Sequence, residues 1–455
     1  MLLHESKRRQ MTEGVEWKSI VLFALPLMLG NLFQQLYNTA DSIIVGNFVG
    51  KEALAAVGSV DPIINTFIGF FMGLSTGAGV VISQFYGAKD EGQVSRAVGT
   101  TICLTAILSI LLSIASYFLL PLFLRFLGTP DDVWNEAYDY LSIYFYGLAG
   151  LLFYNMGSGI LRAIGDSRRP LYFLILSALM NIFLDIVFVA VFSLGVKGVA
   201  YATIISQGVS ALLVLVVLTL EKEMYRIQWK RIGMDMEILS HIFRIGLPSA
   251  LQMMITAFSN IFIQSYINYF GSASMAGWSC YQKIDKLCIL PMQSISLSTT
   301  TFVGQNLGAG KVDRAKRGIR AALILCFAVE IVLGTPTWIY CRGIISLFNR
   351  DPDVIFYGMY YLRHILPFFL IIPIQNILSS ALAGAGNTRI PVMIMIFGFI
   401  IFRQSYLFII TRVLPDVLLP VALGYPAGWV VCSTLMVIYF SRTDLEKYVI
   451  VKRNQ

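Results

Sequence analysis

The sequence predicts an all-α integral membrane protein with twelve transmembrane helices in two pseudo-symmetric lobes of six. Three observations predict this class: an apolar composition, apolar runs of membrane length along the whole chain, and an internal repeat. Of the 455 residues, 57% are hydrophobic and 13% are charged, and the mean hydropathy is +0.72. Soluble domains carry about 25% charged residues. The chain therefore lacks the polar residues that would cover a soluble protein of this size.

Twelve apolar runs recur from one end of the chain to the other. Each is about 20 residues or longer, enough for a helix rising 1.5 Å per residue to cross a hydrocarbon core of about 30 Å. The runs are 20–47, 54–82, 97–124, 137–161, 171–194, 198–220, 241–269, 274–303, 319–341, 356–383, 390–411 and 417–440. The first seventeen residues are polar and charged, and the run behind them is too long for a signal peptide. We therefore expect the first run to insert as a helix.

The basic residues lie mainly in alternate loops. Of the 34 Lys and Arg residues, 24 lie in the two terminal segments and the loops expected on the same side, and six lie in the opposite loops. The positive-inside rule then predicts that both termini are cytoplasmic. The net charge of +8 reflects this topology, so we expect no nucleic-acid partner.

Cysteine, histidine and glycine patterns predict no cofactor. The six cysteines show no CxxC spacing and the three histidines are scattered, so neither set predicts a metal site. The stretch "GQNLGAGK" at 304–311 lacks the spacing of a phosphate-binding GxxxxGK[ST] loop. We therefore expect no ATP-driven transport by this chain alone.

An internal repeat with an offset of 221 residues determines the predicted architecture. "LRAIGDSRRP" at 161–170 returns as "LAGAGNTRIP" at 382–391, and "QFYGAKD" at 84–90 returns as "QNLGAGK" at 305–311. We predict an N-terminal six-helix lobe over 1–220, a cytoplasmic linker over 221–240, and a C-terminal six-helix lobe with a cytoplasmic tail over 241–455. An even number of spans per lobe makes the repeats parallel, an arrangement typical of carriers with a substrate site near the midplane.

Ionisable residues inside membrane spans are functional-site hypotheses because each costs several kcal/mol there. The clearest are Asp41 and Asp185, and the others are Lys283, Asp285, Lys286, Glu330, Arg363, His364 and Arg403. Asn181 and Asp185 are four residues apart and share a helix face. Counting residues along each span places Asp41, Asp185 and Thr203 all in the outer half of the membrane.

Asp41, Asn181, Asp185 and Thr203 are therefore expected to converge in the N-terminal lobe. Such a set of oxygen ligands can hold a proton or a small alkali cation such as Na⁺, and the residues alone leave both readings open. A structural hydrogen-bond network is the alternative. The C-terminal lobe has no such set, because Tyr406 stands at the position of Asp185 in the repeat. In "YQKIDKL", the preferred interpretation is a structural ion pair that joins Asp285 to Lys283 or to Lys286.

The sequence resembles the multidrug and toxic compound extrusion (MATE) family, in its prokaryotic DinF-like branch. The resemblance rests on "LPLMLGNLFQQLYNTADSIIVGNFVG", "QFYGAKD", "RAIGDSRRP" and "NIFLD", and covers essentially the whole chain. It implies the MATE fold and a cation-coupling site at Asp41, Asn181, Asp185 and Thr203. It further implies that Tyr37 and Asn155 line the same cavity and that the first helix bends at Pro26. NorM-type members carry acids in the seventh and tenth helices, and the matching stretches here have none.

The function that the resemblance implies is secondary active export of amphipathic, often cationic compounds in antiport with H⁺ or Na⁺. We expect a monomeric, multi-pass protein of a prokaryotic plasma membrane that takes small drug-like substrates and is not an enzyme. The nearest alternative is a lipid-linked oligosaccharide flippase of the same superfamily, against which the few intramembrane arginines count. An intramembrane enzyme using His364, or a purely structural protein, explains the duplicated chain less well.

Overall fold

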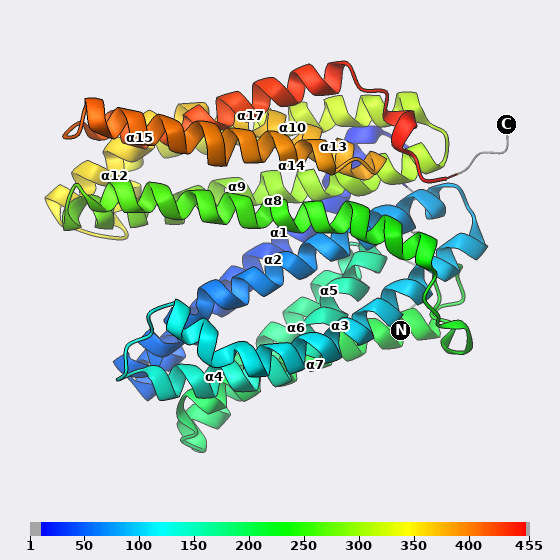
Figure 1. The fold of residues 1–455 in the computed structure, drawn as a ribbon, viewed down its shortest axis with the longest axis horizontal. Helices are drawn as coiled ribbons and strands as arrows, with labels where there is room; N and C mark the ends of the chain where they lie inside the picture. The colour runs from blue at the N-terminus through cyan, green and yellow to red at the C-terminus, as the bar shows by residue number, and fades with distance from the viewer. Residues whose placement is uncertain (1–10, 452–455) are drawn as a thin grey trace. The chain divides into compact units, whose positions relative to one another are not determined.

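The computed structural model describes residues 11–451, apart from the side chains of residues 51 and 52, and this part of the chain contains helices and no strands (Figure 1). The α-helices are α1 (Glu16–Ile44), α2 (Lys51–Gly87), α3 (Glu91–Phe126), α4 (Trp134–Tyr146), α5 (Leu148–Ala163), α6 (Arg168–Asp185), α7 (Gly195–Leu220), α8 (Met236–Asn268), α9 (Ser272–Gly308), α10 (Val312–Ile339), α11 (Cys341–Ser346), α12 (Pro352–Ile365), α13 (Ile372–Ala385), α14 (Arg389–Met395), α15 (Arg403–Val413), α16 (Leu418–Ala422) and α17 (Gly424–Ser441). Three π-helical segments, η1 (Val45–Val49), η2 (Ile186–Val191) and η5 (Ile396–Phe402), and three 3-10 segments, η3 (Trp229–Arg231), η4 (Leu366–Ile371) and η6 (Leu445–Tyr448), complete the set.

The predicted fold class is confirmed, with one difference in the fourth span. Eleven helical stretches in the described part are long and apolar enough to cross a membrane. The remaining predicted span, 137–161, is divided at Gly147 into α4 and α5, of 13 and 16 residues. A Cβ at Gly147 would lie 2.2 Å from Cγ2 of Ile204, so the break is also a point where α7 packs closely.

By packing, the described chain divides into two compact units. The first unit contains Pro26–Ala250, and the second contains residues 11–25 together with the chain from Leu251 onward. Two helices therefore change unit along their length, α1 at Pro26 and α8 after Ala250. The division of the repeat at 221–240 stays a prediction about the duplication, because the boundaries between the two packed units fall inside α1 and α8.

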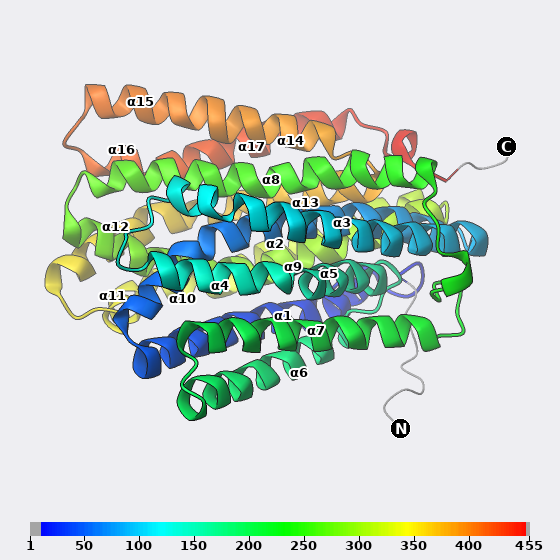
Figure 2. The same cartoon turned by 60° about the horizontal axis from the view of Figure 1, so that its bottom comes forward.

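The first unit has its apolar core between α2, α3, α4, α5 and α7. The rings of Phe67, Phe123 and Phe145 meet edge to face, with centroids 5.5–6.4 Å apart. The helices α6 and α7 lie side by side in this unit, as Figures 1 and 2 both show. This pairing matters for the site, because α6 carries Asp185 and α7 carries Thr203.

The start of α8 packs on α2 through glycines, within the first unit. A Cβ at Gly73 would lie 2.4 Å from the backbone of Ala250, and one at Gly77 would lie 2.5 Å from the carbonyl oxygen of Ile242. Gly73 and Gly77 form a G-x-x-x-G pattern, which lets two helix backbones approach closely in a membrane protein. A larger residue at Gly73 or Gly77 would therefore meet the backbone of α8.

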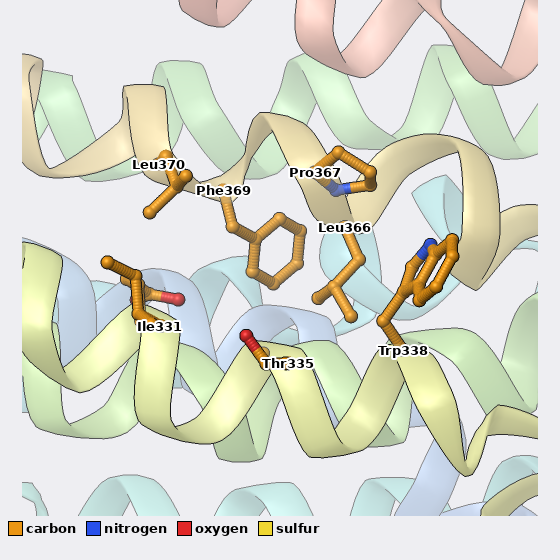
Figure 3. A pocket seen from close by; sticks show the side chains of 9 residues that line it. Ile331, Thr335, Trp338, Leu366, Pro367, Phe369 and Leu370 are labelled. Carbon is orange, nitrogen blue, oxygen red and sulfur yellow. The ribbon is translucent and has the colours of Figure 1, made fainter.

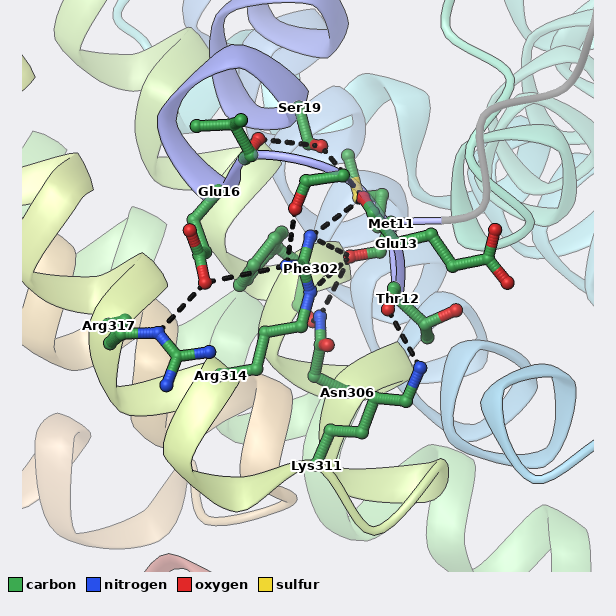
Figure 4. Close-up of polar contacts among 12 residues, drawn as sticks. Met11, Thr12, Glu13, Glu16, Ser19, Phe302, Asn306, Lys311, Arg314 and Arg317 are labelled. Carbon is green, nitrogen blue, oxygen red and sulfur yellow. Dashed lines mark hydrogen bonds and ion pairs between the residues drawn. The ribbon is translucent and has the colours of Figure 1, made fainter.

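Residues 11–25 pack on α9 and α10 in the second unit. Gln305 accepts a hydrogen bond from the Met11 amide at 3.1 Å, and Asn306 donates to the Met11 carbonyl at 3.0 Å. Arg314 donates to the carbonyl oxygens of Glu13 and Gly14 at 2.8 and 2.6 Å (Figure 4). The predicted cytoplasmic start of α1 is thus held by side chains from far along the chain.

Candidate functional site

Asp41 and Asp185 lie together in the first unit. Asp41 is in the last turn of α1 and Asp185 ends α6. Their carboxyl groups lie within hydrogen-bonding reach of each other, and Asp185 is fully buried. Among the described residues, no side-chain or backbone donor satisfies either oxygen of Asp185 or Oδ1 of Asp41. The two acids are therefore neighbours in the structure, and their role as a cation-coupling pair stays a prediction.

Both acids are next to π-helical turns. The segment η1 begins at Val45, one turn after Asp41, and η2 begins at Ile186, directly after Asp185. Gly50 donates to the carbonyl of Val45 at 3.1 Å across the first of these segments. Such widened turns occur mostly as short insertions in α-helices, often at functional sites. No residue pattern considered in the sequence predicts these turns, which have different compositions, VGNFV in η1 and IVFVAV in η2.

Asn181 supplies a neutral donor and acceptor one turn before Asp185 on α6. Its side chain is 2% exposed, and neither its Oδ1 nor its Nδ2 has a partner among the described residues. A buried polar group without a partner costs about 1–3 kcal/mol. A group bound beside the acid pair would relieve this cost.

Thr203 and Asn155 make their hydrogen bonds within their own helices. The buried Thr203 hydroxyl donates to the Val199 carbonyl at 3.0 Å, which leaves its oxygen lone pairs available. Asn155 donates from Nδ2 to the Leu151 carbonyl at 2.9 Å. Among the described residues, neither side chain is hydrogen-bonded to Asp41 or Asp185, so their predicted roles at the cation site stay predictions.

Two tyrosines lie near the acid pair, and the sequence predicts only Tyr37 at this site. Tyr37 lies within electrostatic range of both acids and of Tyr144 and Tyr154, and Tyr140 lies within range of Asp41. Tyr140 and Tyr144 are one turn apart on α4, with stacked rings 6.4 Å between centroids. Their i, i+4 spacing is the available signal in the sequence, but it lies within a span that is otherwise apolar.

Pro26 lies inside α1, which continues through it as a helix. Proline has no backbone N–H, so one hydrogen bond of the helix is missing at this point. The same residue is where α1 passes from the second unit to the first. A bend of α1 at Pro26 stays a prediction.

The predicted ion pair in "YQKIDKL" is wrong. No ion pair joins Asp285 to Lys283 or Lys286 in the described part of the chain. The Nζ of Lys283 instead lies 5.5 Å from the centroid of the Phe348 ring. The carboxyl group of Asp285 accepts a hydrogen bond from the Tyr281 hydroxyl at 3.4 Å. The reason is helical geometry. Residues one or two positions apart do not face each other on a helix.

The buried Arg403 of the second unit has no acidic partner in the described structure. Its guanidinium lies 4.3 Å from the Phe399 ring and 5.0 Å from the Tyr425 ring, and donates to Ser259 and Asn260. Cation–π contacts and hydrogen bonds thus stabilise this charge in place of an ion pair.

The described residues contain no group of three or more His, Cys, Asp and Glu side chains suited to a metal ion. A Na⁺ ion bound at the acid pair would therefore need neutral oxygens as further ligands. Asn181 and Thr203 are the side chains of the predicted set that can supply them. A proton needs only the two carboxyl groups.

The sequence model of the MatE family matches the chain twice, over residues 26–187 and again over 248–408. A curated relative, the probable multidrug resistance protein YoeA of Bacillus subtilis, is 31% identical over 434 residues and covers 93% of each chain. The probable multidrug resistance protein NorM of Thermotoga maritima is 25% identical over 444 residues, covering 96% of this chain and 95% of that protein. Among solved structures, the outward-facing conformation of a multidrug resistance MATE family transporter of the MOP superfamily superposes with a TM-score of 0.89. That structure is 26% identical and covers 96% of this chain and 98% of the other.

Proposed function

Because the chain belongs to the MatE family, a family of membrane transporters, we propose that it exports amphipathic, often cationic organic compounds in antiport with H⁺ or Na⁺. The observation that carries the proposal is the contact between the carboxyl groups of Asp41 and Asp185. Two carboxylates in contact at a buried position repel each other strongly unless a cation lies between them or one carries a proton. Such a pair is suited to bind and release one cation per cycle.

The coupling ion and the substrate would compete through the acid pair. When a proton or Na⁺ from outside neutralises the pair, the site loses its attraction for a cationic substrate. When the ion leaves toward the cytoplasm, the negative charge returns and the substrate can bind. A ligand shifts a conformational equilibrium only by its differential affinity for the two states. The coupling ion must therefore favour one arrangement of α1 and the substrate another.

The aromatic surroundings support the proposed substrate class. Tyr37, Tyr140, Tyr144 and Tyr154 are all electrostatic neighbours of the pair or of one another. Aromatic faces attract organic cations in addition to providing apolar contact area. Curated relatives named as multidrug exporters also support this class over the flippase alternative.

We further propose that the protein resides in a prokaryotic plasma membrane with both termini in the cytoplasm, and that it works as a monomer. The charge distribution between alternate loops supports this orientation. Labelling of single cysteines placed in the loops 88–90 and 193–194 with a membrane-impermeant maleimide would test it. We expect labelling from outside only in the second loop.

The transport proposal is tested in liposomes containing the purified protein and a fluorescent organic cation. We expect uptake into the vesicle, by inversely oriented protein, when a pH or Na⁺ gradient is imposed. Dissipating the gradient with an ionophore should stop it. Equal uptake with and without any ion gradient would contradict antiport.

A further inference from the structure

A hollow of about 170 Å³ lies in the second unit between α10 and the 3-10 segment η4. One wall comes from α10, with Glu330, Gly334 and Trp338 at i, i+4 spacing and Ile331 and Thr335 beside them. The opposite wall comes from Leu366, Pro367, Phe369 and Leu370 of η4. Figure 3 shows the Phe369 ring and the Leu366 side chain pointing from this wall toward Thr335.

The sequence explains why space remains between these two elements. Pro367 comes directly after the first residue of η4, where its missing N–H and fixed φ favour the change from α-helix to a 3-10 turn. Opposite, Gly334 has no side chain, and a Cβ there would find no other atom within 4 Å. The hollow is therefore open where a larger residue at 334 would fill it.

Glu330 is the acid among the residues that line this hollow, and its carboxyl group is buried. Its side chain is 3% exposed, and both of its oxygens lack a hydrogen-bond partner among the described residues. Its electrostatic neighbours are Asp285, Cys288 and Cys326, none of which carries positive charge. An ionised carboxyl group here therefore needs a cation from outside the protein.

The fold itself does not require an acid at this position. In the repeat, Ser109 of α3 is the counterpart of Glu330, and its hydroxyl donates to the Thr105 carbonyl at 2.7 Å, within its own helix. Likewise Ser113 is the counterpart of Gly334, and Tyr146 is the counterpart of Pro367. At these three positions the first unit therefore has neutral side chains and no acid.

The rim and floor of the hollow suit an organic cation. The rim residues Ile331, Trp338 and Leu370 are 54%, 46% and 41% exposed, so this side of α10 presents apolar side chains to the hydrocarbon of a membrane. Phe369 is held edge to face on Trp429 at 5.7 Å, and the Trp338 indole donates to the Arg363 carbonyl at 3.2 Å. Two fixed aromatic rings near a carboxyl group can bind an ammonium group through cation–π and ionic attraction together.

We propose that the hollow between α10 and η4 binds the ammonium head of a lipophilic organic cation that reaches it from the bilayer. A cavity of ~150 Å³ accommodates a molecule the size of benzene, so a head group with one ring or three small alkyl groups matches the 170 Å³ available. The site is separate from the acid pair of the first unit. Binding here requires no ion gradient, so this inference stands apart from antiport.

The test is equilibrium binding of radiolabelled benzyltrimethylammonium to purified protein in nanodiscs without a gradient. The background is Asp41→Asn with Asp185→Asn, which removes the charges of the other acid site. In this background we expect saturable binding that Glu330→Gln weakens by at least about tenfold. Glu330→Ser, which installs the residue of the other lobe, should do the same. Gly334→Leu should also abolish binding, because it fills the hollow while keeping the carboxyl group.

Two controls make the outcome decisive. Neopentylbenzene has the same shape as the labelled cation but no charge, and we expect it not to compete. Lys316→Ala changes an exposed cation of α10 away from the hollow and should leave the affinity unchanged. Unaltered binding in Glu330→Gln or in Gly334→Leu would overturn the proposal, and so would equal competition by neopentylbenzene. If Glu330→Gln fails to fold, Gly334→Leu alone decides.

Discussion

The hydroxyl of Ser298 donates a hydrogen bond to the carbonyl oxygen of Ile20, at 3.1 Å. In the repeat, Ser298 is the counterpart of Gly77, and a Cβ at Gly77 would lie 2.5 Å from the carbonyl oxygen of Ile242. Ile20 and Ile242 are themselves counterparts, each six residues before the proline of the repeated Leu-Pro. In each unit the first part of a proline-containing helix thus packs on a small residue. For α1 that residue is Ser298, which makes a hydrogen bond, and for α8 it is Gly77, which allows close packing.

Substitutions at these two counterparts should have different costs. Ser298→Ala removes one hydrogen bond and should lower the free energy of unfolding by about 1 kcal/mol. Gly77→Ala should cost more, because the new Cβ meets backbone atoms of α8. Thermal unfolding in detergent measures both. Gly208→Ala is the matched control, since a Cβ at Gly208 meets no atom within 4 Å; a Gly77→Ala protein as stable as this control would contradict the packing.

Asp41→Asn should abolish gradient-driven export while expression and folding persist. The substitution removes the charge but keeps the shape and most hydrogen-bonding capacity. Export of a fluorescent cation from energised vesicles is the measurement. Asp139→Asn is the control, because Asp139 pairs with Lys197 at 3.1 Å at a partly exposed position. Near-normal export by Asp41→Asn would exclude the coupling role of this acid.

Thr203→Val distinguishes the two coupling ions. A proton needs only the carboxyl groups, whereas Na⁺ needs several oxygen ligands arranged around it. If Na⁺ is the coupling ion, deleting the Thr203 oxygen should weaken Na⁺ binding markedly and leave any proton response nearly unchanged. We expect H⁺ to drive export, so Thr203→Val should alter the pH dependence only modestly. Export driven by a Na⁺ gradient at constant pH, and lost in Thr203→Val, would show that Na⁺ is the driver.

Arg314→Ala should loosen residues 11–25 from the second unit. The arginine donates to backbone carbonyls of that segment and pairs with Glu16 at 3.4 Å, and Arg317 donates to the same carboxyl at 2.9 Å. Hydrogen exchange of the amides at 11–20 should become at least several times faster. Lys316→Ala, at an exposed neighbouring position, should leave exchange unchanged. If Arg314→Ala also leaves it unchanged, these contacts do not hold the segment.

The helical fold and the meeting of the two acids could be predicted from the sequence. Membrane length and apolarity determine the spans, and residue counts from each end place Asp41 and Asp185 both in the outer half of the membrane. The break at Gly147 could not be predicted, because the run on both sides is equally apolar. The close approach of Ile204 at this point is a contact with a helix far along the chain, which no local pattern shows. The positions in α1 and α8 at which the chain passes from one unit to the other also depend on tertiary packing, and no local sequence pattern marks them.

Other features depended on side-chain direction, which an apolar run does not encode. The ion pair predicted for Lys283 and Asp285 failed because residues two positions apart point in different directions on a helix. Glu330 was recognised as an intramembrane acid, but the hollow beside it arises from Gly334 and Pro367 on different elements. Composition reveals that such residues exist and leaves open what they face.

The contacts of residues 11–25 have a consequence for biosynthesis. Met11 is joined to Gln305 and Arg314 across 294 and 303 positions of the chain. At about 5–20 residues per second, a ribosome needs roughly 15–60 s to make the chain between them. Throughout that interval the start of α1 is already made, but the surface of α9 and α10 that it contacts does not yet exist. In a fragment truncated after the first lobe, residues 11–25 would therefore never find their contacts on α9 and α10. A fragment beginning at Leu251 would leave that surface of α9 and α10 free. We expect a separately synthesised peptide of residues 11–25 to bind there.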